Sequence, residues 1–521
     1  MWGGTLMKLN YKRTILVGFA FFLISAFWQA YDATIPVILT NKFGMSQAWS
    51  GVIMAIDNIL AVFMLPLFGA ISDKCLGRFG KRTPFITIGT TIAAVALVAL
   101  SFVDSTQLQN IAPVSVINDP AGLEVLYDTQ GSKQLLTPDG QVFVLKEEFT
   151  REEFVAIRTE DPETGLSDPD YTNFVVPARQ AYAAQQTRAN ARPLVVFILI
   201  LLVLLVAMST FRSPAVALMP DVTVKPLRSK ANAVINLMGT AGGILVLVLG
   251  MVFATSSVKN SLMNYTVFYS VVAGIMLLAL AIFLATVREK KWSKQMQEDS
   301  VRLGIEEAVE ESGEKRGLTG PEKRSLVFIL LSIALWYFGY NAVTSKYAVY
   351  AGNILQKDYN TTLLLAQAAA ILAYLPAGMV ASKIGRKKTI LAGVVMLCAA
   401  FSAAAFMRAE SPTWMMNAMF ALAGIAWATI NVNSFPMVVE MCSGADIGKN
   451  TGFYYTASMS AQIVTPMLSG YLMDRPGLGM TVLFPYAAVF VGLAFVTMLM
   501  VRHGDTKATP KSGLEAFDMD D

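Results

Sequence analysis

The sequence predicts an all-α polytopic membrane protein with twelve transmembrane helices in two pseudo-symmetric halves of six. Of the 521 residues, 55% are hydrophobic and 15% are charged, whereas a soluble domain usually carries about 25% charged residues. Many apolar stretches reach about 20 residues, which is long enough to cross a hydrocarbon core about 30 Å thick. Polar features of the first half also recur in the second half at fixed offsets.

The basic residues of the loops predict the orientation of these spans. Lys and Arg gather before span 1 and between spans 2 and 3, 4 and 5, and 8 and 9, while the alternate short loops carry one at most. By the positive-inside rule, the basic loops and both termini are cytoplasmic, and we expect a multi-pass protein of the plasma membrane. The predicted spans are residues 14–37, 48–71, 84–103, 193–219, 231–254, 263–287, 325–350, 361–382, 388–407, 412–438, 450–473 and 480–502.

Two polar stretches interrupt the spans. Residues 104–191 carry 14 acidic and 6 basic residues, and alternation at 142–145, a Pro-Asp-Gly turn at 138–140 and the run at 154–157 predict a small strand-containing extracytoplasmic insert. We expect this insert to act as a cap or in assembly. Residues 288–324 mix charges densely and predict a cytoplasmic linker with some helix. The predicted units are 1–103 (spans 1–3), 104–191 (insert), 192–287 (spans 4–6), 288–324 (linker), 325–502 (second half) and 503–521 (cytoplasmic tail).

The two halves repeat at measurable offsets. The Tyr-Asp-Ala at residues 31–33 matches Tyr-Asn-Ala at 340–342 with an offset of 309, and Asp221 matches Glu440 with an offset of 219. The offsets differ by 90 residues, which is close to the length of the insert. Duplicated six-span halves with a site between them are typical of secondary transporters.

One loop carries a family resemblance. Residues 69–86 read Gly-Ala-Ile-Ser-Asp-Lys-Cys-Leu-Gly-Arg-Phe-Gly-Lys-Arg-Thr-Pro-Phe-Ile, which resembles the loop between spans 2 and 3 of the major facilitator superfamily. More narrowly, this loop and residues 217–233 resemble the sucrose–proton symporter branch of the glycoside–pentoside–hexuronide symporters. The resemblance implies the major facilitator fold, alternating access and cation-coupled symport.

The same resemblance bears on the coupling ion. Melibiose-type members place cation-binding acids on span 2, and the matching positions here are Leu65 and Ala61. The sequence therefore favours a proton over sodium as the coupling ion, with no cofactor and no metal site.

Charged residues at the cytoplasmic helix ends predict a gate that latches the inward face closed through ion pairs. Arg82, with Lys81, can reach Asp221 at the end of span 4, and Asp73 can accept hydrogen bonds at a helix end. The alternative is that these charges only determine topology. Ser382 stands where the repeat predicts an acid, so we expect a weaker latch in the second half, where Glu440 could meet Arg386 or Lys388. The remaining predicted gate residue is Arg228.

Two carboxyl groups lie within predicted spans, where a charge costs about 2.5–3.5 kcal/mol on insertion scales. Asp32 in span 1 and Asp57 in span 2 lie roughly 8 and 14 Å from the outer ends of their spans, so both can face one cavity. A carboxyl group in such a site can bind and release a proton near neutral pH, so we assign proton coupling to Asp57 and Asp32. The alternatives are a solvated Asp32 near the surface and an Asp57 that packs with Asn58.

Polar and aromatic side chains on several spans predict a binding site for a neutral sugar. Arg212 in span 4 could pair with an intramembrane acid, hold a substrate hydroxyl or snorkel to the headgroups, whereas Lys346 is expected to snorkel. Aromatic faces suit the C–H faces of a sugar, and amides suit its hydroxyls. The predicted substrate-binding residues are Trp28, Gln29, Tyr31, Asn58, Arg212, Asn236, Trp336, Tyr340, Asn341, Trp427, Asn431, Tyr455 and Gln462.

These observations lead to the hypothesis of a proton-coupled symporter of a neutral sugar or glycoside, sucrose- or maltose-like, that works by alternating access. A proton-driven exporter of drugs or metabolites is the main alternative, followed by a transport-dead nutrient sensor. An enzyme is not expected, because the sequence has no P-loop, no HExxH motif and no convincing nucleophile–base pair. The expected partners are a small-molecule substrate and the lipid bilayer, without nucleic acid, and the expected state is a monomer.

Overall fold

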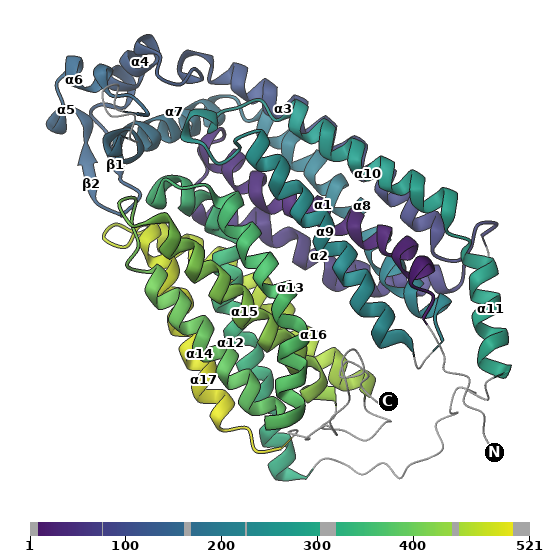
Figure 1. The fold of residues 1–521 in the computed structure, drawn as a ribbon. Helices are drawn as coiled ribbons and strands as arrows, with labels where there is room; N and C mark the ends of the chain where they lie inside the picture. The colour runs from purple at the N-terminus through teal and green to yellow at the C-terminus, as the bar shows by residue number, and fades with distance from the viewer. Residues whose placement is uncertain are drawn as a thin grey trace.

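Two helical bundles lie side by side in the computed structural model (Figure 1). The structure describes residues 9–75, 77–160, 168–224, 227–302, 319–439 and 447–503. The first bundle consists of α1 (Tyr11–Asn41), α2 (Gln47–Asp73), α3 (Thr83–Asn110), α8 (Arg192–Val222), α9 (Arg228–Val252) and α10 (Thr266–Thr286). The second consists of α12 (Gly320–Tyr350), α13 (Tyr359–Ile384), α14 (Arg386–Ala404), α15 (Thr413–Val439), α16 (Ile447–Met473) and α17 (Leu483–Leu499).

The all-α polytopic membrane fold is confirmed. Ten of the described helices are long and apolar enough to cross a membrane. Helices satisfy their backbone hydrogen bonds internally, which is what a hydrocarbon environment requires. At the predicted spans 8 and 11, α13 and α16 are 26 and 27 residues long, while the full count of twelve spans stays a prediction. Span 3 is longer than predicted, because α3 continues to Asn110.

Local sequence signals explain where several helices begin. The Ser46 side chain accepts a hydrogen bond from the backbone of Trp49 and caps α2. Pro84 stands in the first turn of α3, where its missing N–H costs nothing. Thr319 and Glu322 form a capping box at the start of α12. These signals pair or remove backbone N–H groups at the helix starts and fix where the helices begin.

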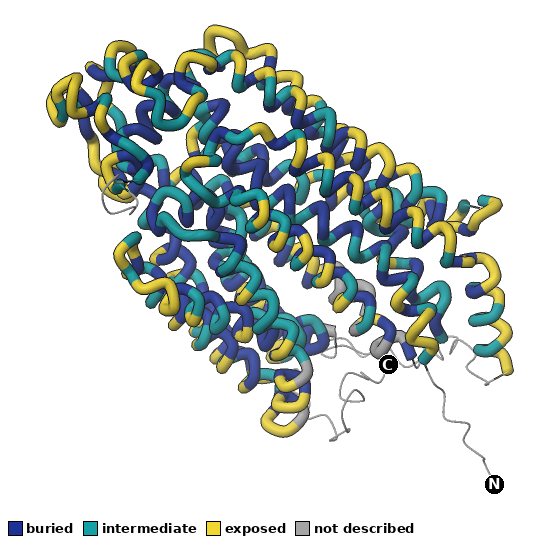
Figure 2. Tube along the Cα trace, turned by 45° about the horizontal axis from the view of Figure 1, so that its top comes forward, coloured by how far each residue is buried: buried dark blue, intermediate teal, exposed yellow. Residues whose placement is uncertain are grey.

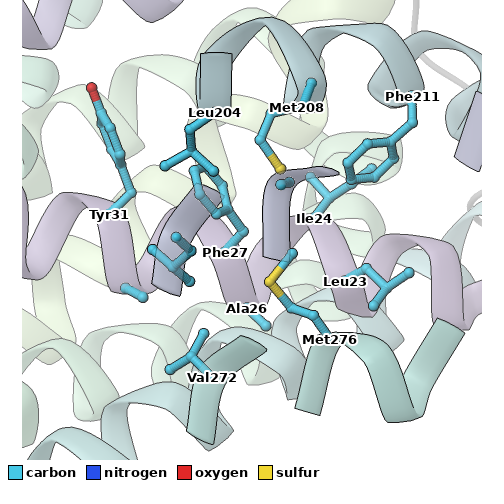
Figure 3. Packing of buried hydrophobic residues seen from close by; sticks show 14 of the residues in the cluster. Leu23, Ile24, Ala26, Phe27, Tyr31, Leu204, Met208, Phe211, Val272 and Met276 are labelled. Atoms are coloured by element: carbon cyan, nitrogen blue, oxygen red, sulfur yellow. The ribbon is translucent and has the colours of Figure 1, made fainter. Parts of the chain in front are cut away.

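Each bundle has its own apolar core. In the first bundle, Figure 3 shows Phe27 of α1, Leu204 of α8 and Met276 of α10 packed together, and each side chain is fully buried. Buried residues follow the interior of both bundles in Figure 2. Large apolar side chains such as Phe102 and Leu372 are 60% and 77% exposed. An exposed apolar surface on a membrane-spanning helix is suited to lipid contact.

Among the described helices, three pairs join the bundles: α1 with α12, α2 with α16, and α9 with α13. The second and third pairs join spans 2 and 11 and spans 5 and 8, so they are related by the internal repeat. The backbones of α2 and α16 approach very closely. A Cβ atom on Gly51 would lie 2.0 Å from the Pro466 carbonyl oxygen, and one on Gly470 would lie 2.2 Å from that of Gln47. Only glycine permits this approach.

The insert lies at one end of the molecule, beyond the ends of α1 and α3 (Figure 1). Strands β1 (Gln134–Leu136) and β2 (Val142–Val144) form an antiparallel hairpin, as the alternation at 142–145 predicts. A strand at 154–157 is wrong, because Thr150 and Glu153 form a capping box that starts a helix there. The insert helices are α4 (Pro120–Gln130), α5 (Leu145–Glu148), α6 (Arg151–Ala156) and α7 (Val176–Ala189).

The predicted helix in the linker is present as α11 (Glu289–Arg302), which lies at the end of the molecule opposite the insert (Figure 1). Its buried face carries Trp292, which is 8% exposed and packs against the core of the first bundle. The guanidinium of Arg13 lies 5.2 Å from the centre of the Trp292 ring. The remainder of the linker, 303–318, and the tail from 504 lie outside the described residues.

Candidate functional site

A cavity of about 190 Å³ lies where helices of both bundles meet. It is lined from the first bundle by α1, α2 and α8 and from the second by α12 and α16. The side chains that line it are mostly polar, which is unusual at the centre of a membrane protein and points to a ligand site. The lining residues are Trp28, Asp32, Met54, Asp57, Asn58, Arg212, Asn341, Thr344, Ser345, Gln462 and Pro466.

The charged lining residues come from three different helices. Asp32 of α1, Asp57 of α2 and Arg212 of α8 all face this cavity, and the Asn58 amide donates a hydrogen bond of 2.8 Å to Asp57. The Arg212 guanidinium lies 5.6 Å from the centre of the Trp28 ring, so this side chain points into the cavity and does not snorkel. Within the described ranges, no carboxylate oxygen lies within 4.0 Å of the Arg212 guanidinium. The same residues contain no group of three or more His, Cys, Asp or Glu side chains that could hold a metal ion.

Two hydrogen-bond donors in the cavity wall lack protein partners. The indole Nε1 of Trp28 and the amide Nδ2 of Asn341 are buried, and neither has a hydrogen-bond acceptor in the described part of the chain. A buried donor without an acceptor costs about 1–3 kcal/mol. A hydroxyl-bearing ligand in the cavity would satisfy both donors.

Three residues of the predicted binding set lie elsewhere. Tyr31 is 2% exposed in the core of the first bundle, among the packed side chains in Figure 3, and Trp336 is fully buried in the core of the second. Both fill bundle interiors because their large apolar rings gain more from packing than from a polar cavity. Asn236 on α9 is exposed and does not line the cavity.

Five further predicted residues also lie outside the cavity lining: Gln29, Tyr340, Trp427, Asn431 and Tyr455. The rings of Tyr340 and Trp427 stack with centroids 3.6 Å apart and planes 4° from parallel. The Gln367 side chain of α13 donates to the Gln29 amide oxygen at 2.7 Å, which links the two bundles. Of the remaining two predicted residues, Asn431 hydrogen bonds with the Tyr374 hydroxyl, and Tyr455 is 50% exposed.

Four lining residues were missed by the sequence reasoning: Met54, Thr344, Ser345 and Pro466. Thr344 and Ser345 follow Asn341 by three and four residues, which places them on the same helix face. This spacing is the sequence signal that could have identified Thr344 and Ser345 as lining residues. Met54 precedes Asp57 by three residues and Pro466 follows Gln462 by four, so each shares a helix face with a predicted lining residue, although neither side chain is itself polar.

The predicted cytoplasmic gate contains a well-formed ion-pair cluster. The Arg82 side chain donates to Asp221 at 2.7 Å and also to Asp73 and Ser72. Burial alone would lower the pKa of the Arg82 guanidinium, but the contacts with Asp221 and Asp73 outweigh burial and raise that pKa. All four residues belong to the first bundle, so this cluster joins α2, α3 and α8 and does not bridge the halves. A gating role remains a prediction.

The other gate residues are placed as follows. Lys81 contributes its backbone N–H to Glu289, Arg386 is half-buried at the start of α14, and Lys388 is exposed. The side chain of Arg228 and the whole of Glu440 lie outside the described residues.

Glu289 of α11 is a contact that sequence reasoning missed. Its carboxylate is 3% exposed and accepts backbone N–H groups of Arg82 and Thr83 at 2.8 Å each, in addition to that of Lys81. A carboxylate at this position caps the N-terminus of α3 and offsets its positive helix dipole. Gly80 allows the approach, since a Cβ atom there would lie 2.2 Å from the carboxylate.

We expect Glu289→Gln to release α11 from the bundle. The amide replaces one accepting oxygen with a donor and leaves a buried N–H unpaired, at a cost of about 1–3 kcal/mol. Hydrogen exchange of residues 289–302 should accelerate roughly tenfold or more. Glu298→Gln is the matched control, because the Glu298 side chain is 64% exposed and forms a loose surface pair with Lys294 at 3.8 Å. Equal exchange in the two variants would contradict the capping role.

At the end of the molecule that carries the insert, two charged side chains of the second bundle form hydrogen bonds with the first bundle. The Asp474 carboxylate accepts the backbone N–H groups of Gln47 and Ala48 at 2.8 and 2.7 Å, at the start of α2. Lys346 is fully buried and donates to the Gln47 carbonyl at 2.6 Å, so the prediction that it snorkels is wrong. The cause is the Gln47 carbonyl at the buried start of α2, which offers Lys346 an acceptor inside the protein.

A second contact between the bundles lies near Asp358, which caps α13. Its carboxylate accepts a hydrogen bond of 2.6 Å from Ser256, and Tyr359 bonds to Thr255 at 2.8 Å. Burial alone would raise the pKa of Asp358, but hydrogen bonds from Ser256 and Thr361 outweigh burial and hold its pKa below the ordinary value.

The lowered pKa of Asp358 predicts a pH dependence of stability. A group whose pKa is depressed by folding stabilises the fold above its unfolded pKa, about 3.9 for aspartate, and loses this contribution as the pH falls. At pH 7 we expect the wild-type protein to have a higher melting temperature than Asp358→Asn. The difference between the two melting temperatures should shrink below about pH 4. Melting midpoints in detergent across this range check it, and a difference independent of pH would contradict it.

Two family models match separate parts of the chain. Residues 16–110 match the model described as MFS/sugar transport protein, and residues 358–517 match the model described as Major Facilitator Superfamily. The two matches fall in opposite halves of the molecule, and the first includes both intramembrane acids, Asp32 and Asp57.

Relatives share short segments with this chain. Sucrose transport protein SUC4 of Arabidopsis thaliana is 30% identical over 74 residues, which is 14% of each protein. SUC3 of the same plant is 34% identical over 67 residues, 13% of this chain and 11% of the relative. Proton-associated sugar transporter A of Homo sapiens is 39% identical over 66 residues, 13% of this chain and 8% of the relative. The chain thus aligns with a small part of each relative's length.

Solved structures match along nearly the whole chain. The inward-open xylose transporter XylE from E. coli has a TM-score of 0.57 at 14% identity, covering 98% of this chain and 99% of that one. The nucleoside transporter NupG has a TM-score of 0.52 at 14% identity, covering 95% of this chain and 100% of that one. At this identity the likeness shows the fold.

Proposed function

We propose that the chain is a membrane transporter of the major facilitator superfamily, not an enzyme, and that it is a proton-coupled symporter of a neutral sugar or glycoside. The observation that carries the proposal is the central cavity, where two carboxyl groups, one guanidinium and several amides meet between the bundles. Transport proceeds by alternating access, in which the two bundles rock about this cavity.

Proton coupling is assigned to Asp57 and Asp32 because both line the cavity. Two acids beside one arginine leave one carboxyl group that can take up a proton without an unbalanced charge. Protonation and substrate binding in one cavity are then linked, since each changes the electrostatic environment of the other. The Asn58 amide donates a hydrogen bond of 2.8 Å to Asp57 and so helps to hold that carboxyl group at the cavity wall.

A sugar suits the cavity for two reasons. The partnerless donors of Trp28 and Asn341 can bind hydroxyl oxygens, and Arg212 can hold two oxygens with its planar guanidinium. The names of the relatives add support, since two are sucrose transport proteins and one is a proton-associated sugar transporter. We further propose a monomer in the plasma membrane with cytoplasmic termini, as the basic loops favour.

The experiment that tests the proposal follows the pH inside dye-loaded proteoliposomes as sugar is added outside. Sucrose, maltose and a simple hexose are added in turn, each with an osmotically matched mannitol control. Acidification that depends on one sugar supports proton symport and identifies the substrate class. A flat trace with every sugar, in protein shown to be folded, would overturn symport. The proton-driven exporter would then be tested with lipophilic cations, while sodium-dependent uptake without acidification would overturn the choice of coupling ion.

A further inference from the structure

We propose that the hairpin of the insert, residues 134–144, is a strap that holds the two bundles together on the insert side and stabilises the state closed on that side. The insert belongs to the first bundle by sequence, yet its hairpin contacts the loop between α16 and α17 of the second. This inference rests on alternating access, which is part of the proposed function, but it does not depend on the substrate.

The contact consists of two backbone hydrogen bonds. The Gly477 N–H donates to the Gly140 carbonyl at 2.7 Å, and the Met480 N–H donates to the Pro138 carbonyl at 2.6 Å. The turn is itself ordered, because Thr137 and Gly140 are joined by a backbone bond of 2.9 Å. The hairpin tip therefore reaches the partner loop as a preformed turn.

The fit between turn and loop is close. A Cβ atom on Gly479 would lie 2.3 Å from the backbone nitrogen of Gly140, and one on Gly140 would lie 2.5 Å from the nitrogen of Gly479. Both glycines also have positive φ, +57° and +91°. Gly477 in the same loop has a φ of +80°, but a Cβ atom there would meet nothing within 4 Å.

The other end of the strap is fixed to the first bundle. Gln180 of α7 donates to Asn41 at the end of α1 at 2.8 Å, and a Cβ atom on Gly44 would lie 2.2 Å from the backbone nitrogen of Ala184. Lys259 also forms an ion pair of 2.7 Å with Glu160 of the insert. Because the insert is anchored on one bundle and its hairpin on the other, opening on this side must break the hairpin contact.

The strap acts beside the charged contact described above. The loop that the hairpin contacts begins directly after α16. At this point the Asp474 carboxylate accepts a hydrogen bond from the backbone of Gln47 at the start of α2. Loss of the hairpin contact removes two hydrogen bonds from the closed state and leaves the Asp474 contact in place. We expect opening on the insert side to become roughly 5- to 100-fold more frequent.

The test compares Gly479→Ala with Gly477→Ala. Both variants place a methyl group at positive φ in the same loop, and both keep the backbone N–H, including that of residue 477 that donates to Gly140. Only the methyl group at residue 479 collides with the hairpin. Each is made in a background that lacks the three native cysteines, Cys75, Cys398 and Cys442, and carries Thr344→Cys in the cavity wall. The rate of labelling by a membrane-impermeant maleimide in right-side-out vesicles measures opening, and hydrogen exchange of residues 475–482 measures docking of the hairpin.

In Gly479→Ala, the amides of residues 475–482 should exchange faster, and the cysteine at position 344 should be labelled roughly 5- to 100-fold faster than in the parent protein. In Gly477→Ala, both rates should stay within about twofold of those of the parent. Faster exchange without faster labelling would overturn the strap. Unchanged exchange would also overturn it, since the contact would then be absent from the protein. If Gly479→Ala does not fold, Gly140→Ala gives the same readouts from the hairpin side. A labelling result in either direction is independent of the sugar experiment, so the two proposals fail separately.

Discussion

Asp57→Asn is expected to abolish accumulation of sugar against its gradient while exchange of sugar across the membrane continues. Asparagine keeps the size and polarity of the side chain, but it cannot take up a proton. For each proton carried per sugar, one pH unit supports about tenfold accumulation. In proteoliposomes with an inward gradient of two pH units, wild type should approach about 100-fold accumulation and the variant about onefold.

Asp32→Asn is the matched control for Asp57→Asn, because Asp32 is the other carboxyl group in the same cavity. If Asp57 alone couples transport, Asp32→Asn keeps driven uptake and changes mainly the apparent affinity. Driven uptake that survives intact in Asp57→Asn and is lost in Asp32→Asn would transfer the coupling role to Asp32. Survival in both single variants would show that neither acid is needed for coupling.

Lys42→Met is expected to destabilise the protein by about 3–5 kcal/mol. The Lys42 ammonium and the Asp104 carboxylate are both fully buried, with Nζ–Oδ distances of 2.6 and 2.7 Å. Lys42 also donates to the Met263 carbonyl at 2.7 Å. Removing the cation leaves a carboxylate buried without its counter-charge, which costs much more than the pair contributes. The melting temperature in detergent should fall by several degrees.

Two controls separate this effect from simple loss of a lysine. Lys259→Met breaks the pair with Glu160, whose side chains are 51% and 43% exposed, and should cost at most about 1 kcal/mol. The double variant Lys42→Met with Asp104→Leu removes both buried charges and should recover most of the stability. A double variant as unstable as Lys42→Met would show that shape, and not charge, explains the loss.

The position of Asp104 shows where sequence reasoning stopped short. The apolar run ends near residue 103, which predicts that Asp104 is the first residue of the insert. In the structure α3 continues to Asn110, so Asp104 belongs to this helix and is fully buried. The helix can continue because Lys42 neutralises the carboxylate. A hydropathy pattern cannot anticipate a compensating charge 62 residues away.

The central cavity shows the opposite case. Asp32, Asp57 and Arg212 could be singled out from sequence, since a charge in an apolar run needs a reason, and all three line the cavity. The aromatic residues could not be sorted in this way. Trp28 lines the cavity and Trp336 lies in the core, although both are tryptophans within a span. Their side chains have the same hydropathy, so only helix rotation in the bundle separates them.

The sequence by itself determined the membrane class, the repeat of polar features between the two halves and the charged residues that line the cavity. These follow from local properties, namely span length, loop charge and residue type, which do not depend on packing. The tertiary structure alone decided that the Arg82 cluster stays within one bundle, that Lys346 is buried and that the insert reaches the second bundle. Each of these depends on contacts between segments distant in sequence, and such contacts are fixed by how the bundles pack.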